Sequence, residues 1–251
     1  MKKLITSNPF LYTLGLILVF VLWIIISYGL GPGNLVFPSP IDVFKATGTI
    51  LSDSFTYQSI GNSLLRTFEG FSISFLAALL LGSLTGEIKA LQLVFKPLII
   101  VLKSAPTAAF VFLFLLLTGS SFAPICIVTL LAFPILYESV VAGYNAVPEQ
   151  MIFAAKVDGA SRLRRAMKVE LPLALPFVIL GMVNSFALSF KTEIMAEIIA
   201  GDTNAGIGGA IRMYRNEDPS NLAPIFGLAL IAIIIILLFD LISHLIKKRF
   251  A

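Results

Sequence analysis

The sequence predicts an all-α fold, a polytopic membrane protein with about six transmembrane helices. Of the 251 residues, 58% are hydrophobic and 13% are charged, which is about half the charged fraction of a soluble globular domain. The apolar runs are long, and they do not alternate with polar residues at every second position. Only helices or closed β-barrels span a bilayer, and a barrel requires that alternation. Composition and periodicity together therefore favour a helical membrane protein.

Six apolar runs reach the length of about 20 residues that a bilayer requires. They cover residues 10–30, 61–86, 97–119, 122–143, 173–200 and 222–246. The first run is longer than the apolar core of a signal peptide and lacks a clear cleavage site, so we expect it to be a retained span. There is no internal repeat and no long linker, and residues 1–251 are expected to form a single transmembrane domain.

Basic residues are distributed unevenly between these runs. One side holds twelve of them: Lys2, Lys3, Lys89, Lys96, Lys156, Arg162, Arg164, Arg165, Lys168, Lys247, Lys248 and Arg249. The other side holds three: Lys45, Arg212 and Arg215. Positive charge marks cytoplasmic loops, so both termini and the 144–172 segment are predicted to be cytoplasmic. Because the net charge of +4 lies in these short loops, it does not indicate nucleic-acid binding.

Two outer segments have their own structure. "FPSPIDVFKATGTIL" continues from Pro-Ser-Pro into an amphipathic pattern, which predicts a short interfacial helix. "AGDTNAGIGGAIRMYRNEDPS" is rich in glycine and polar residues, which predicts a loop with a short helix. The chain has one cysteine, Cys126, and one histidine, His244, so a disulfide framework, a Cys/His metal site or a histidine-based triad is not expected.

The most charged stretch of the chain is the cytoplasmic segment at about residues 147–172. Pro148 and Glu149 suit a helix start, and Gly159 suits the helix end or a bend. Ser161 suits the cap of a second short helix. The segment is therefore predicted to be a helix–turn–helix with small residues before its turn, where another surface can approach closely. The alternative is a solvated basic loop that only fixes topology.

The spacing within this segment resembles a motif of binding-protein-dependent ABC importer permeases. Ala154-Ala155 is followed by three residues, Gly159, nine residues and then Val169-Glu170-Leu171-Pro172. Phe153 stands where the family often has glutamate. "GASR", "LPLALP", "LLRTFEGFSISFLAALLLG" and "AEIIAGDTNAGIGGAI" are similar to the nitrate/sulfonate/taurine-type group of these permeases.

The resemblance implies a type I importer permease in the inner membrane of a prokaryote. Its partners would be a dimer of separate ABC ATPase subunits, an extracytoplasmic substrate-binding protein and a second permease copy, commonly the same chain. The chain has no G-x-x-x-x-G-K-[ST] motif, so ATP and magnesium would be bound by the ATPase, and this chain would be neither an enzyme nor a cofactor protein. The segment 149–165 would be the coupling helix that docks the ATPase, through Ala154, Ala155, Asp158, Gly159, Ala160, Ser161, Arg162 and Arg165.

Polar residues inside the fifth run suggest a translocation pathway, since charged groups in a span are costly and usually functional. One broad face is expected to hold Asn184, Ser185, Ser189, Lys191 and Thr192, with Glu193 near its edge. Lys103 and Thr107, beside Pro106 in the third run, are a second candidate region. The alternatives are interhelical hydrogen bonding for the fifth run and a snorkelling Lys103. A different function, an ion-coupled secondary transporter using Lys191, Glu193 and Glu197, would not need the 149–172 segment.

Overall fold

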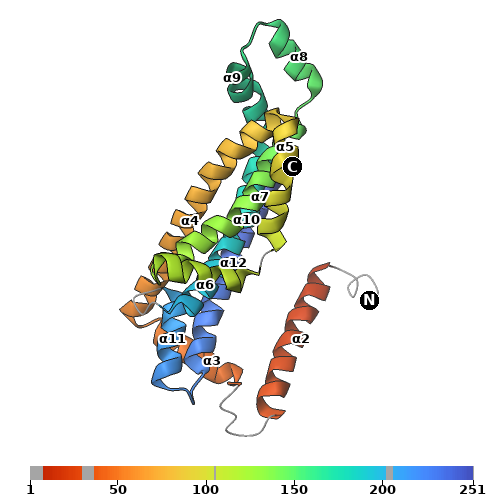
Figure 1. Cartoon of the computed structure of the whole chain (residues 1–251). Helices are drawn as coiled ribbons and strands as arrows, with labels where there is room; N and C mark the ends of the chain where they lie inside the picture. The colour runs from red at the N-terminus through yellow and green to blue at the C-terminus, as the bar shows by residue number, and fades with distance from the viewer. Residues whose placement is uncertain (1–7, 30–36, 105, 202–205, 251) are drawn as a thin grey trace.

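The computed structural model describes residues 8–29, 37–104, 106–201 and 206–250, which are almost entirely helical (Figure 1). Four helices in these ranges are long and apolar enough to cross a bilayer. They are α4 (Ser54–Glu87), α7 (Ala123–Asn145), α10 (Leu171–Ala200, continuous with the preceding short helix) and α12 (Ala223–Phe250). The predicted all-α membrane fold is confirmed.

The third predicted span, residues 97–119, is not one straight helix. The chain forms α5 (Lys89–Ser104) and α6 (Thr107–Thr118), which are bent by 94° relative to each other. Pro106 precedes α6, and a proline both lacks an N–H and disfavours helix in the residue before it. Taken as one broken span, the pair brings the number of candidate spans to five.

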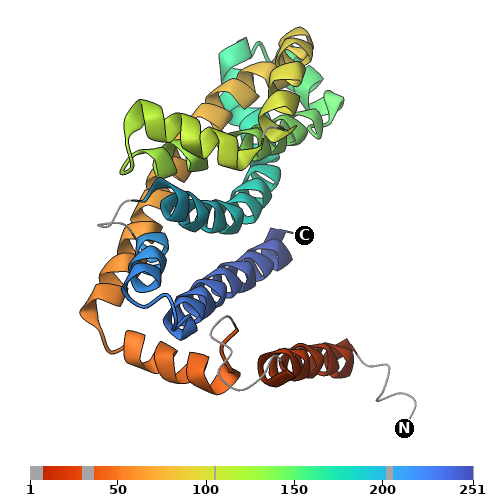
Figure 2. The ribbon, with the colours of Figure 1, turned by 60° about the horizontal axis from the view of Figure 1, so that its bottom comes forward.

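The first predicted span is a helix, α2 (Asn8–Gly29), that stands apart from the other helices in both views (Figures 1 and 2). Its apolar part, Thr13–Gly29, is shorter than the four long candidates. Trp23 donates a hydrogen bond to the carbonyl of Pro38 (3.1 Å), which ties the end of α2 to the chain before α3 (Pro40–Ile50).

The centre of the bundle is the packing of α7 between α4 and α10. Small residues recur every three or four positions along the buried face of α4: Ser59, Ser63, Thr67, Gly70, Ser74, Ala78 and Gly82. A Cβ added at Gly82 would meet Val140 of α7 at 2.8 Å, and one added at Gly143 of α7 would meet Ala174 of α10 at 2.8 Å. Such small residues let helix backbones approach closely in a membrane.

Aromatic side chains join α12 to this centre. The ring of Phe186 on α10 packs edge to face against Phe71 of α4 at 5.1 Å and against Phe239 of α12 at 5.0 Å between centroids. Edge-to-face pairs are a favourable geometry for aromatic rings. One residue of α10 therefore links three of the long helices.

The two ends of the bundle carry different short helices (Figure 1). α8 (Glu149–Val157) and α9 (Arg162–Arg165) project from one end, and α3 and α11 (Ile207–Glu217) lie at the other. The predicted interfacial helix is α3, which begins at Pro40 after an N-cap in which Ser39 accepts from the N–H of Asp42. The predicted short helix of the second outer segment is α11, so each outer segment contains a helix as predicted.

Candidate functional site

The turn between α8 and α9 has the local structure that the sequence predicts. Gly159 has a φ of +74°, in the left-handed region where a side chain is unfavourable. The N–H of Ala160 donates to the carbonyl of Ala155 (3.0 Å), and the N–H of Gly159 donates to that of Lys156 (3.0 Å). This pair of bonds is the Schellman motif, which ends a helix at a glycine. Ser161 then caps α9 by accepting from the N–H of Arg164 (3.4 Å).

The α8–α9 segment lies beyond the end of the bundle (Figure 1), and this segment and the turn after it carry exposed apolar side chains. Met151, Phe153, Val157, Leu163 and Met167 have exposed fractions between 52% and 70%. Ala154, Asp158 and Gly159 are also exposed, and no atom lies within 4 Å of the place where a Cβ on Gly159 would stand. A cluster of exposed large apolar residues marks an interaction surface.

The arginines of this segment have different surroundings. The side chain of Arg162 is 70% exposed, whereas that of Arg165 is 13% exposed. Arg165 Nε lies 2.5 Å from Glu170 Oε1, and Arg165 Nη2 lies 4.0 Å from Glu87 Oε1 at the end of α4. Arg162 is therefore available to another molecule, while Arg165 faces its own chain.

The predicted polar face of α10 is divided into two by the structure. Asn184 and Lys191 are exposed and share a stripe with Leu188 and Met195. By contrast, Ser185, Ser189, Thr192 and Glu193 are buried within the chain, with exposed fractions of 8% or less. A helix turns by about 100° per residue, so the broad face expected from sequence includes both the exposed stripe and the side that packs on α7. Sequence alone could not place the boundary between them.

The buried serines of α10 bond to their own helix. Ser185 Oγ donates to the carbonyl of Gly181 and Ser189 Oγ to that of Ser185, both at 2.8 Å. Their hydroxyls are thereby satisfied, and both residues serve close packing. Glu193 is fully buried, and neither of its carboxyl oxygens has a hydrogen-bond partner among the described residues.

Glu197 holds together three segments that are distant in sequence. Its carboxylate accepts from Ser63 Oγ of α4 (2.9 Å) and from the backbone N–H groups of Gly206 (3.0 Å) and Gly208 (2.9 Å). Arg66 Nη1 lies 3.7 Å from Glu197 Oε1. A carboxylate at the first N–H groups of a helix stabilises that helix, so Glu197 caps α11. Sequence reasoning missed this role, because the partners lie far along the chain.

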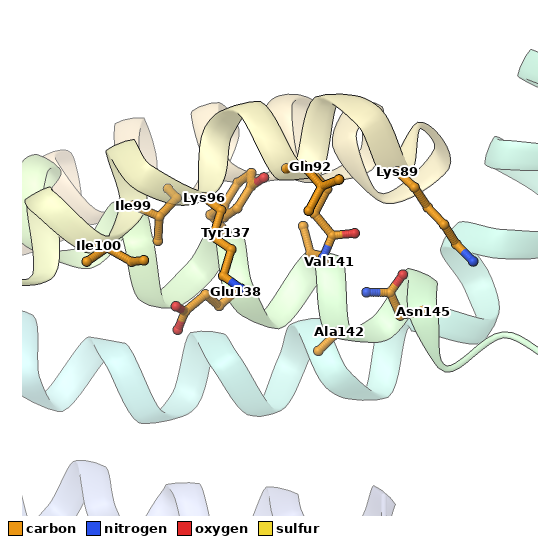
Figure 3. A pocket seen from close by; sticks show the side chains of 11 residues that line it. Lys89, Gln92, Lys96, Ile99, Ile100, Tyr137, Glu138, Val141, Ala142 and Asn145 are labelled. Carbon is orange, nitrogen blue, oxygen red and sulfur yellow. The ribbon is translucent and has the colours of Figure 1, made fainter.

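A groove of 540 Å³ runs between α5 and α7 (Figure 3). Its polar lining comprises Lys89, Gln92, Lys96, Glu138 and Asn145. In Figure 3 the side chains of Gln92 and Lys96 extend from α5 toward α7. Next to the groove, Lys103 Nζ donates to both carboxylate oxygens of Glu138 at 2.8 and 3.0 Å. Lys103 thus takes part in a specific ion pair, whose two side chains are about half-exposed.

The lysines of α5 share one face of the helix with the exposed Leu93 and Ile100, and its other exposed apolar residues lie on the opposite side. Lys89, Lys96 and Lys103 are spaced by seven residues, which places them within about 40° of one another around the helix. Val94, Leu98 and Val101 occupy the opposite side and are 49% to 70% exposed. An apolar face suits lipid, whereas a lysine face needs water or polar partners. Thr107, the first residue of α6, is partly exposed at the bend beyond Lys103.

Residues 70–251 match the sequence profile of a family described as binding-protein-dependent transport system inner membrane component. The chain belongs to this family. It is therefore a permease of the binding-protein-dependent ABC importer type, a class of membrane proteins that are not enzymes themselves and that work with an ATPase and a substrate-binding protein.

Several relatives of the permease are transport proteins that are named for different solutes. It is 28% identical over 217 residues to a riboflavin transport system permease protein of Chloroflexus aurantiacus, covering 85% of this chain and 80% of that one. It is 25% identical over 205 residues to a putative aliphatic sulfonates transport permease protein of Bacillus subtilis, covering 81% and 73%. The narrower resemblance to the nitrate/sulfonate/taurine-type group stays a prediction.

Solved structures share the fold of the permease. An amino acid ABC transporter matches with a TM-score of 0.66 and 21% identity, over 80% of this chain and 97% of that chain. An inward-facing methionine ABC transporter matches with a TM-score of 0.67 and 19% identity, over 78% and 96%. These likenesses show the type I importer permease architecture.

Among the described residues of the permease, no three histidine, cysteine, aspartate or glutamate side chains are grouped as a metal site.

Proposed function

We propose that this permease forms the membrane pathway of an ATP-driven importer for a small polar or anionic solute, and that segment 149–165 docks a separate ATPase dimer. The observation that carries the proposal is the α8–α9 segment, which presents four exposed apolar side chains around a glycine-centred turn beyond the end of the bundle. A surface of this kind requires a protein partner, and the family supplies one. An ion-coupled carrier has no use for it.

The details of the turn suit insertion into a groove of the ATPase. Gly159 is open to its surroundings, and Ala154 and Ala155 before it are small, so the partner can approach the backbone closely. Met151 and Phe153 would be buried in that groove. Arg162 would pair with acidic groups at its rim, because its side chain is 70% exposed.

The distribution of basic residues supports a cytoplasmic location for the docking segment and for both termini. The opposite end, with α3 and α11, would then face the substrate-binding protein in the inner membrane of a bacterium. A second copy of the permease would complete the pathway.

We infer that the pathway is lined by the exposed stripe of α10, with Asn184 and Lys191, and by the lysine face of α5. The Lys103–Glu138 pair and Thr107, at the bend of the third span, would close it in this state. Ser185, Ser189, Thr192 and Glu193 would support the wall from inside the bundle. Relatives whose names include sulfonates, nitrate and riboflavin support a small polar or anionic solute.

The docking proposal is tested with Gly159→Glu and Gly119→Glu. Both glycines have positive φ, +74° and +79°, and neither has an atom within 4 Å of an added Cβ, so each change places a side chain at a positive-φ position without a steric clash. Only Gly159 lies in the docking segment. We expect Gly159→Glu to abolish copurification of the ATPase and solute uptake by whole cells, whereas Gly119→Glu keeps the ATPase bound.

Normal ATPase binding and uptake by a well-expressed Gly159→Glu variant would show that the segment is not the dock. The solute class is tested separately by uptake of radiolabelled nitrate, an alkanesulfonate and riboflavin into the same cells.

A further inference from the structure

The chain between the docking segment and α10 contains a π-helical turn, Ala166–Glu170, in which the N–H of Leu171 donates to the carbonyl of Ala166. In an α-helix, residues five apart point about 140° away from each other. A π turn has i to i+5 hydrogen bonds and brings such residues onto nearly the same face. This turn places Arg165 and Glu170 side by side, where a regular α-helix would separate them.

The resulting ion pair is largely buried. The Arg165 side chain is 13% exposed and that of Glu170 is 5% exposed, with 2.5 Å between Nε and Oε1. A buried charge that keeps its partner has a fixed geometry, whereas removal of one partner leaves an unfavourable isolated charge. Arg165 and Glu170 therefore behave as one rigid connection between the docking segment and the start of α10.

The same guanidinium reaches α4, but less closely. Arg165 Nη2 lies 4.0 Å from Glu87 Oε1, which is buried and has no hydrogen-bond partner among the described residues. A buried carboxylate oxygen without a hydrogen bond is unfavourable. If Arg165 Nη2 and Glu87 Oε1 moved about 1 Å closer together, they would come within hydrogen-bond range. The buried oxygen of Glu87 would then gain a hydrogen-bond donor.

The neighbouring arginines do not share this position. Arg162 approaches Glu87 to 4.0 Å as well, but its side chain is 70% exposed and screened by solvent. Arg164 is exposed, and no ion pair joins it to another described residue. Within this basic run, Arg165 is thus the residue directed into the bundle.

We propose that Arg165, Glu170 and Glu87 form the link that transmits movement of the docked ATPase to α4 and α10. The proposal rests on the docking function proposed above, and it assigns Arg165 to positioning within the permease rather than to contact with the ATPase. Movement of the docking segment closes the Arg165–Glu87 contact while Arg165–Glu170 stays intact. The ends of α4 and α10 are then drawn together.

The experiment compares Arg165→Met with Arg164→Met, which removes the same charge one residue away from the link. Each permease is purified with the ATPase subunit that copurifies with the wild type and is reconstituted in liposomes with the binding protein. Two quantities are measured: ATPase bound per permease, and the stimulation of phosphate release by the binding protein. Glu87→Gln and Arg165→Lys are measured in the same way.

Coupling between sites in proteins commonly amounts to about 5- to 150-fold, and we expect Arg165→Met to reduce the stimulation by about tenfold at unchanged ATPase content. Glu87→Gln should show the same loss, Arg165→Lys a smaller one, and Arg164→Met none. The proposal is overturned if Arg165→Met assembles and keeps wild-type stimulation. It is also overturned if Arg165→Met folds but loses the ATPase, because Arg165 would then belong to the dock itself. If Arg165→Met does not fold, Glu87→Gln tests the proposal instead, through the ATPase bound per permease and the stimulation of phosphate release.

Discussion

Ser63 of α4 donates a hydrogen bond of 2.9 Å to Glu197 of α10, across 134 positions of sequence, and both side chains are fully buried. Removal of the hydroxyl leaves a buried carboxylate oxygen with one donor fewer. Ser63→Ala should therefore lower the unfolding free energy by about 1–3 kcal/mol. Thermal unfolding in detergent measures the change. Ser52→Ala, at an exposed serine, is the control, and its unfolding free energy should stay within about 0.5 kcal/mol of the wild type. Equal effects of the two changes would contradict the proposed role of the Glu197 network.

The Lys103–Glu138 pair is about half-exposed, with side-chain exposed fractions of 47% and 49%. Exposed ion pairs contribute about 0–1 kcal/mol to stability, so Lys103→Met should fold normally. If the pair closes the pathway, its loss should change uptake severalfold, and Glu138→Gln should also change it. Initial uptake rates measure this effect. Lys45→Met, at an exposed lysine of α3, is the control. Unchanged uptake in both pair variants would show that the pair has no role in the pathway.

Lys191 lies on the exposed stripe of α10, and no ion pair or hydrogen bond joins its side chain to another described residue. Lys191→Met keeps the length and removes the charge. We expect normal expression and ATPase binding but impaired uptake, with Lys191→Arg closer to the wild type. Size-exclusion chromatography and uptake are the measurements. A variant that fails to assemble would show instead that the charge supports helix packing.

The close approach of α4 and α7 predicts opposite effects at two glycines of one helix. A Cβ at Gly82 would meet Val140 at 2.8 Å, whereas a Cβ at Gly61 has no atom within 4 Å. Gly82→Ala should cost about 1–3 kcal/mol through overpacking. Gly61→Ala should be neutral or stabilise by up to about 1 kcal/mol through helix propensity. Thermal unfolding of both variants measures the difference, and equal midpoints would mean that the helices do not touch as described.

The membrane orientation is tested with single cysteines in a Cys126→Ala background. Leu163→Cys lies in the docking segment and is exposed, and Arg215→Cys lies on α11 at the opposite end. With the docking segment in the cytoplasm, a membrane-impermeant maleimide added to intact cells labels the cysteine at 215 and spares that at 163. In lysed cells it should label both. The reverse pattern in intact cells would invert the proposed topology.

Much of the local structure follows from the sequence. Gly159 and Ser161 predict the turn and the cap between α8 and α9, because capping depends on residues that are adjacent in the chain. The same holds for α3, which begins where Ser39 and Pro40 predict. Four of the six predicted spans correspond to long apolar helices, because length and composition determine them.

The tertiary partners did not follow from the sequence. Pro106 alone suggests an ordinary proline kink in the third span. The 94° bend between α5 and α6 is larger than such a kink. The π turn that pairs Arg165 with Glu170 has no simple sequence signature, so Arg165 was expected to contact the ATPase. The buried position of Glu193 depends on how α7 and α4 cover α10, which periodicity within one helix does not specify.

The close packing of α4, α7 and α10 has a mechanical consequence. Where backbones meet across glycine and alanine, few rotatable side chains remain to absorb a displacement, so the three helices act as one stiff lever. The docking segment connects α7 to α10 and therefore pushes on that lever at one end. The corner at Pro106 lacks a backbone hydrogen bond from a proline N–H, so we expect it to yield more easily than the lever. Force applied at the segment should then be taken up as bending at this corner, beside Lys103.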